Sequence, residues 1–220
     1  MSKNILTSEY ITNAQIQICT RCIYDERVPS ISFDDQGVCN YCYQVDKLKE
    51  QFGTGAEKGK LLLEGIVEEI RIAGHDKRYD CVVGVSGGTD SSYLLHLAKG
   101  WGLRPLAVHY DNTWNSAIAT TNIQKVLSVL GVDLYTHVVN NKEVDDILRS
   151  FFLAGVAELD AATDLGYAYL LRQVTAKYGI HHILEGHSFV AEGITPLGRN
   201  YFDGRYIQAI HQQYGSMPMD

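Results

Sequence analysis

Residues 81–91 join a short apolar segment to a glycine-containing loop, and they read Cys81-Val82-Val83-Gly84-Val85-Ser86-Gly87-Gly88-Thr89-Asp90-Ser91. The residues that follow, 92–98, are rich in leucine and predict a helix. Two adjacent glycines let the backbone turn tightly with its N–H groups converging, and the start of a helix adds a partial positive charge. The pattern therefore predicts a strand, an anion-binding loop and a helix, with a plain glycine-rich turn as the alternative.

Strands and helices are predicted to alternate from residue 79 onward. We expect strands at 81–85, 105–110, 134–139 and 181–185. The helices between them begin near Asp90, span 116–130, and carry the apolar positions 144–151 and 167–178, and two of them end at Gly131 and Gly179. This order predicts an α/β fold, a Rossmann-like parallel sheet flanked by helices.

Polar residues follow three of these expected strands. Ligands of parallel sheets bind beyond the carboxyl ends of the strands. The segments at such ends are Ser86–Ser91, Asp111–Trp114 and Gly186–Ser188. The hydroxyl groups and the carboxylate of the first segment suit the phosphates of a nucleotide and a metal ion.

Four of the five cysteines form two pairs, Cys19 with Cys22 and Cys39 with Cys42, separated by sixteen residues. Two such pairs supply four thiolates, which suits a tetrahedral Zn²⁺ ion with a structural role. An iron–sulfur cluster and four unligated thiols are the alternatives. The segment between the pairs is too short for a core of its own, so we expect the metal to hold it together.

The chain is expected to divide into a leader (1–18), a Cys₄ metal-binding module (19–50), a linker with an amphipathic helix (51–78), and the α/β domain (79–220). It has 19 basic and 26 acidic side chains, a formal net charge of −7 and no run of Lys or Arg, which argues against a nucleic-acid partner. No segment approaches the ~20 apolar residues of a membrane span or the core of a signal peptide. We therefore expect a cytoplasmic protein.

The loop 86–91 resembles the pyrophosphate (PP) loop of the N-type ATP pyrophosphatases, which have the adenine nucleotide α-hydrolase fold and cleave ATP to AMP and pyrophosphate. With the cysteine pairs, Asp111-Asn112-x-Trp114, Gly193-Ile194-Thr195-Pro196 and Tyr201-Phe202-Asp203-Gly204-Arg205-Tyr206, the chain is similar to the N-acetyl sugar amidotransferases. This resemblance covers about residues 19–213. It implies a ligase that makes acetamidino sugars for lipopolysaccharide O-antigens and for flagellin glycosylation.

The resemblance also implies roles for individual residues. Catalysis would fall to Asp90, acting through Mg²⁺ or by holding the loop, and to Ser91; a helix N-cap is the alternative role for Asp90. The residues expected to bind ATP are Val85, Ser86, Gly87, Gly88, Thr89, Asp90, Ser91, Asp111, Asn112 and Gly186. The weaker candidates for the sugar substrate are Trp114, His187, Arg199 and Arg205, each of which has an ordinary structural role as its alternative.

Three features depart from the family pattern. Thr89 stands where the family often has Lys, so another basic residue or Mg²⁺ would have to supply the missing charge. Thr113 stands where the family often has Gly, so the second loop is expected to differ in shape. Family members usually run well beyond Gly204-Arg205-Tyr206, so the α/β domain is expected to be short at its carboxyl end.

The source of ammonia is expected to be a partner glutaminase. A glutaminase needs an exposed nucleophilic cysteine, whereas four cysteines are assigned to metal and Cys81 lies in an apolar strand. Two alternatives remain at this point: a tRNA thiolase of the same fold, and a non-catalytic scaffold that binds a nucleotide. A thiolase would ordinarily carry cysteines in its ATP domain, and none follows Cys81.

Overall fold

The computed structural model describes residues 16–194 and 202–219. The chain divides into two compact units, Met1–Gln51 with Phe189–Arg199, and Phe52–Ser188 with Asn200–Asp220. The larger unit holds the sheet, and the smaller holds the paired cysteines.

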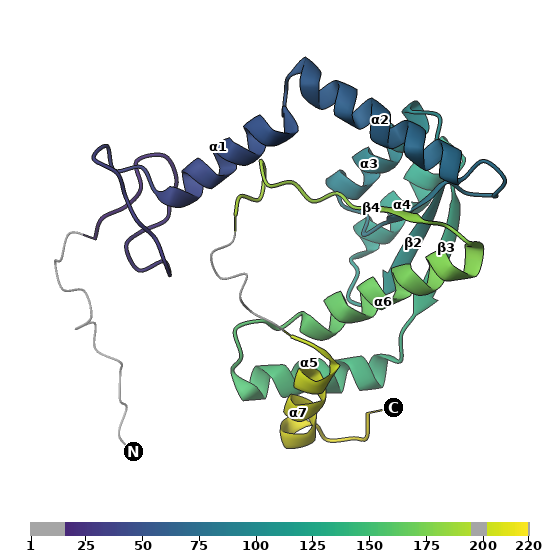
Figure 1. Ribbon diagram of the computed structural model, residues 1–220. Helices are drawn as coiled ribbons and strands as arrows, with labels where there is room; N and C mark the ends of the chain where they lie inside the picture. The colour runs from purple at the N-terminus through teal and green to yellow at the C-terminus, as the bar shows by residue number, and fades with distance from the viewer. Residues whose placement is uncertain (1–15, 195–201, 220) are drawn as a thin grey trace. The chain divides into compact units, whose positions relative to one another are not determined.

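The sheet of the larger unit has four strands, all parallel, in the order β3-β2-β1-β4. Figure 1 labels β2, β3 and β4 of this sheet. The strands are β1 (Cys81–Gly84), β2 (Pro105–Asp111), β3 (Asp133–Val138) and β4 (His182–Leu184). In the register of the sheet, Val82 lies between Leu106 of β2 and Ile183 of β4. The predicted α/β fold class is confirmed, and all four predicted strands are present with small shifts at their ends.

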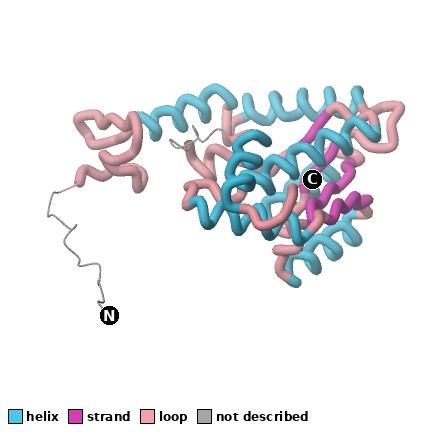
Figure 2. Tube along the Cα trace, turned by 90° about the horizontal axis from the view of Figure 1, so that it is seen from below, coloured by secondary structure: helices cyan, strands magenta, loops and turns pink. Residues whose placement is uncertain are grey.

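Helices cover both faces of the sheet, as Figure 2 also shows. Side chains alternate along a strand, so Cys81 and Val83 face one side and Val82 faces the other. On the first side pack α2 (Glu57–Ala73), α3 (Thr89–Gly100) and α4 (Ala117–Leu130), and on the second packs α6 (Ala161–Tyr178). Both faces of β1 are therefore buried, which explains its uninterrupted apolar sequence.

The helix ends follow local chemistry. Ser116 caps α4 by accepting a hydrogen bond from the amide N–H of Ala119 at 3.2 Å. Gly131 and Gly179 end α4 and α6 in the left-handed conformation that glycine adopts without strain. Both predicted helix stops are thus confirmed.

Two helices lie outside the predicted pattern. α7 (Gly204–Tyr214) packs against α5 (Asn141–Ala154) through Ile207 and Ile210. α1 (Asn40–Phe52) starts inside the cysteine-rich segment and shortens the expected linker, because α2 already begins at Glu57. Gly59 lies inside α2, and an added Cβ there would collide with the backbone of Gly53. Glycine at this position therefore allows a close approach of two backbone segments and does not form a flexible linker.

The smaller unit has little regular structure besides α1. Two isolated antiparallel bridges, Ile18 with Asp25 and Phe33 with Cys39, fold the segment around the cysteines. The Tyr24 hydroxyl donates a hydrogen bond to the carbonyl oxygen of Ile194 at 2.8 Å, which ties in the segment after Phe189. Across residues 16–194 and 202–219, no helix is long and apolar enough to cross a membrane.

Candidate nucleotide site and metal centre

The glycine loop follows β1 directly and is held against the start of α4. Gly87 has a φ of +79°, and an added Cβ would collide with the carbonyl oxygen of Ala119. The Asn122 side-chain amide donates to the carbonyl oxygen of Gly87 at 3.3 Å. Position 87 therefore requires glycine both for its backbone angle and for space.

The start of α3 leaves its first amide groups open to a ligand. Its N-cap is Gly88, and no side chain caps this end, so the first-turn N–H groups and the helix dipole remain available to an anion. The N-cap alternative for Asp90 is therefore wrong, since Asp90 lies in the first turn. The hydroxyl oxygens of Ser86 and Ser91 accept from the loop amides of Gly88 and Ser86, each at a long 3.4 Å.

Gly186 lies beside this helix start. An added Cβ on Gly186 would come within 3.3 Å of the carbonyl carbon of Asp90 and 3.4 Å of its Cβ. The chain runs from β1 outward to β2 and β3 and then returns to place β4 on the other side of β1. The loop and Gly186 therefore border the point where the strand order reverses, which is where open α/β sheets bind ligands.

The second loop, after β2, is shaped by its own side chains. Asp111 accepts a hydrogen bond from the Thr113 amide at 2.8 Å, and Asn112 accepts one from the Trp114 amide at 3.1 Å. Thr113 adopts a φ of +65°, a left-handed conformation that a β-branched residue rarely takes. The loop therefore contains a left-handed turn that favours glycine, although position 113 is threonine.

His109 joins the two loops, although it was not predicted as a site residue. It is 6% exposed in β2. Its Nδ1 lies 2.9 Å from the carbonyl oxygen of Val85, and its Nε2 lies 3.4 Å from the side-chain amide of Asn115. Asn115 in turn reaches Asp111 at 3.4 Å. The signal in the sequence was one histidine near the end of an otherwise apolar strand.

The weaker substrate candidates are spread over the larger unit and beyond. Trp114 is 61% exposed at the second loop. His187 follows Gly186 and faces Asp164, whose pKa is raised by burial and by Asp160 and lowered in part by His187. Arg205 is exposed in the first turn of α7. Arg199 lies outside the described residues.

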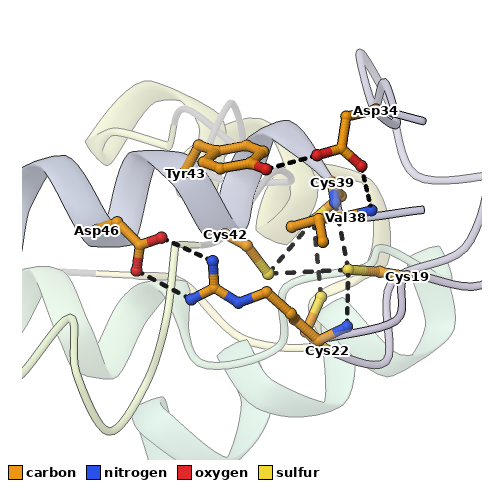
Figure 3. A network of polar contacts seen from close by, with 9 residues as sticks. Cys19, Cys22, Asp34, Val38, Cys39, Cys42, Tyr43 and Asp46 are labelled. Carbon is orange, nitrogen blue, oxygen red and sulfur yellow. Dashed lines mark hydrogen bonds and ion pairs between the residues drawn. The ribbon is translucent and has the colours of Figure 1, made fainter. Parts of the chain in front are cut away.

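The four paired cysteines converge in the smaller unit (Figure 3). All four sulfur atoms lie within 4.8 Å of one another, with Cys19–Cys42 at 3.8 Å and Cys22–Cys39 and Cys39–Cys42 at 3.7 Å. Four thiolates held at about 2.3 Å from one tetrahedral zinc ion are about 3.8 Å apart. The geometry therefore fits a single metal ion, whereas the thiolates of an iron–sulfur cluster bind different iron atoms and are spread more widely.

Outer contacts fix these cysteines in place. Burial raises the pKa of Cys19, but its hydrogen bonds together outweigh burial and lower this pKa to about 6. These bonds come from the amides of Arg21 and Cys39, each 3.3 Å from the Cys19 sulfur, and from Cys22. Arg21 forms a two-bond ion pair with Asp46 of α1 at 2.6 and 2.9 Å (Figure 3). Such outer hydrogen bonds orient metal ligands and favour their thiolate form.

Cys81, the fifth cysteine, is fully buried in the central strand. Burial raises its pKa to about 12, so it does not supply an accessible thiolate. The prediction that Cys81 is buried is confirmed, and Cys81 therefore does not fit the nucleophile of a glutaminase.

No family model matches the chain. A protein of Methanocaldococcus jannaschii described as uncharacterized is 27% identical over 174 residues, which make up 77% of this chain. The chain spans 58% of the length of that curated relative.

Several solved structures have a similar chain trace. They include a glutamine-dependent NAD⁺ synthetase from Acinetobacter baumannii in complex with ADP, with a TM-score of 0.46 and 17% identity over 68% of this chain and 31% of that one. NMN synthetase from Francisella tularensis has a TM-score of 0.45 and 16% identity over 69% of this chain and 68% of that one. An NH₃-dependent NAD synthetase from Campylobacter jejuni has a TM-score of 0.43 and 15% identity over 70% and 72%.

Proposed function

We propose that the chain is an ATP-dependent, AMP-forming amidotransferase that converts the acetamido group of an N-acetyl sugar into an acetamidino group. The observation that carries the proposal is the uncapped start of α3 behind the loop 86–91, placed where the strand order reverses. Open amide groups at this position suit the phosphates of a nucleotide. The sequence resemblance described above supplies the reaction class.

The reaction has two steps. In the first, the acetamido oxygen attacks the α-phosphorus of ATP, and the bond from that phosphorus to the pyrophosphate oxygen breaks. In the second, ammonia adds to the activated carbon, one of its protons passes to a base, and the carbon–oxygen bond breaks to release AMP and the amidine. Such chemistry needs alignment and charge stabilisation more than covalent help from the protein.

The residues divide between the two ligands. The amides of Gly87, Gly88 and Thr89 would bind the leaving pyrophosphate, and the hydroxyls of Ser86 and Ser91 would donate to it. Val85 and Gly186 would border the nucleotide, and Asp111 and Asn112 would contact its nucleoside. Asp90 offers a carboxylate to Mg²⁺, which supplies neutralising charge when bound. Trp114, His187 and Arg205 are the substrate candidates within the described residues.

Ammonia would come from a partner glutaminase. The four clustered cysteines fit a structural zinc ion, and Cys81 is buried with a raised pKa. These observations support delivery of ammonia by another protein.

A product assay tests the proposal. The purified chain is incubated with ATP, Mg²⁺, ammonium and a panel of UDP-linked 2-acetamido sugars, with and without a candidate glutaminase plus glutamine. AMP together with a sugar in which NH has replaced one oxygen, seen by mass spectrometry, is the expected result. Gly87→Ala should abolish AMP formation, while Gly100→Ala should leave it unchanged, since a Cβ at position 100 meets nothing within 4 Å. Measurable ATP binding without AMP from any sugar would overturn the proposal in favour of a scaffold.

A further inference from the structure

A cavity of about 250 Å³ lies beside the second loop, between α5 and the start of α6. We call it the Trp114 pocket. Trp114, Val144 and Leu148 are among its apolar walls, and its polar groups come from Asn112, Asp160 and Thr163. An apolar wall with a few polar groups is the usual composition of a small-molecule site.

Trp114 is held in place although most of its surface is exposed. Its indole Nε1 donates a hydrogen bond to Asp145 at 3.1 Å, while 61% of the residue remains accessible. An exposed indole that is already oriented offers a flat apolar surface at a small entropic cost on binding. This arrangement suits the apolar face of a ring.

The polar groups of the pocket are available to a ligand. Asp160 is the N-cap of α6, yet its carboxylate accepts no capping hydrogen bond. The carbonyl oxygen of the Asn112 side chain accepts from the Trp114 amide, which leaves the NH₂ group of that side chain to face a ligand. With the Thr163 hydroxyl, these groups both donate and accept, which matches a ligand bearing hydroxyl and amide groups.

The charge of the pocket opposes phosphate. Asp160 lines it, Asp145 holds its indole, and Asp164 lies close enough to Asp160 and Glu158 for their charges to raise its pKa. No Lys or Arg lines the pocket in the part of the chain that the structure describes. The negative charges around the pocket would repel an anionic group.

The position of the pocket separates it from the phosphate loop. The uncapped start of α3 and Gly186 lie at the junction of β1 and β4, whereas the pocket lies beyond the end of β2. Its volume is below the ~300–1,000 Å³ of pockets for drug-sized ligands. It therefore accommodates one substituted ring and not a whole nucleotide-linked molecule.

We infer that the Trp114 pocket binds the uncharged sugar ring of the acceptor, with the ring stacked on Trp114, and keeps the phosphates of both the acceptor and ATP outside. This inference rests on the proposed function, since it names the part of the acceptor that the pocket holds. Asn112 then borders both the ring and the nucleotide.

Fluorescence tests the inference without any turnover. Trp101 and Trp114 are the two tryptophans of the chain, so Trp101→Phe leaves Trp114 as the only indole reporter. UDP-N-acetylglucosamine and other UDP-linked 2-acetamido sugars are titrated, with UDP alone and AMP as controls. We expect a saturable change with at least one sugar nucleotide that persists when AMP is saturating, and none with UDP alone. The same change with UDP alone, loss of the sugar response at saturating AMP, or no change with any sugar nucleotide would overturn the inference.

Variants on one helix provide a matched pair. Leu148→Phe fills the pocket and should weaken the sugar response about tenfold, while Leu153→Phe, on the exposed side of the same helix, should not. Thr163→Val removes one hydroxyl at nearly constant volume, so it tests the pocket even if Leu148→Phe misfolds. If Leu148→Phe and Leu153→Phe weaken the sugar response equally and Thr163→Val leaves it unchanged, the assignment is contradicted.

The two proposals fail in different ways. AMP release in the product assay reports the proposed reaction, and Trp114 emission reports occupancy of the pocket. A saturable change in Trp114 emission without AMP release would refute the proposed reaction and support the sugar site. If Leu148→Phe leaves the rate of AMP formation unchanged at subsaturating sugar, the sugar site is refuted and the proposed reaction is supported.

Discussion

The Nδ1 atom of His109 lies 2.9 Å from the carbonyl oxygen of Val85, and this contact joins β2 to the start of the glycine loop. Because a carbonyl oxygen only accepts hydrogen bonds, the Nδ1 atom of His109 donates to Val85, and Nε2 lies 3.4 Å from the side-chain amide of Asn115. His109 thereby links Val85 to the loop that contains Asp111.

His109→Leu should therefore weaken both stability and nucleotide binding. The substitution leaves the buried Val85 carbonyl oxygen without its donor, at a cost of about 1–3 kcal/mol. His109→Asn restores an N–H near the position of Nδ1 and should recover part of the loss. Urea unfolding and ATP titration by calorimetry measure the two effects. Equal losses in the Leu and Asn variants would show that this hydrogen bond plays no part.

Thr113→Gly should stabilise the protein. Thr113 has a φ of +65°, and the left-handed conformation costs a non-glycine residue about 1–2 kcal/mol, part of which the larger unfolded-state entropy of glycine offsets. Thr113→Ala keeps the unfavourable angle and serves as the control. A higher midpoint of urea unfolding for the Gly variant alone is expected. A loss of stability at Thr113→Gly would mean that the angle carries no strain.

Several elements were predictable because their causes are local. Gly131 and Gly179 end helices through their own backbone angles, and the apolar run of β1 reflects burial on both faces. α7 was not predicted because Ile207 and Ile210 are buried only by packing against α5, which is distant in sequence. His109 was missed for the same reason, since its role depends on the pairing of β1 with β2.

Removing the metal should unfold the smaller unit. We expect about one zinc per chain by elemental analysis, because four thiolates complete a tetrahedral site. Chelation should expose the segment between Cys22 and Cys39 to proteolysis. Zinc should also be released as the pH falls, because protons compete for the thiolates. Cys81→Ala, in the other unit, should leave the zinc content unchanged. Several iron atoms per chain together with inorganic sulfide would contradict the single-ion site.

Asp146 binds the segment after α7 and should make the stability of the protein depend on pH. The Ser216 hydroxyl and amide hold its pKa far below the usual carboxyl range, against the effect of burial, and His211 assists from 2.9 Å. A lowered pKa means that the stabilisation is present above the usual carboxyl value and is lost as the pH falls toward the folded value. Asp146→Asn should lower the urea midpoint at neutral pH.

The difference between Asp146→Asn and the unmodified chain should shrink as the pH falls below about 4. Glu64→Gln, at an exposed position of α2, serves as the control and should change little at any pH. A gap for Asp146→Asn that stays constant down to acid pH would show that the carboxylate charge makes no contribution.

An isotope measurement tests the central claim most directly. An acceptor sugar carrying ¹⁸O in its acetamido carbonyl is incubated with ATP, Mg²⁺ and ammonium, and the AMP is examined by mass spectrometry. Attack of that oxygen on the α-phosphorus predicts that the label moves into the phosphate of AMP while the sugar gains NH. AMP without the label, formed while the sugar keeps its ¹⁸O, would contradict activation of the acetamido oxygen.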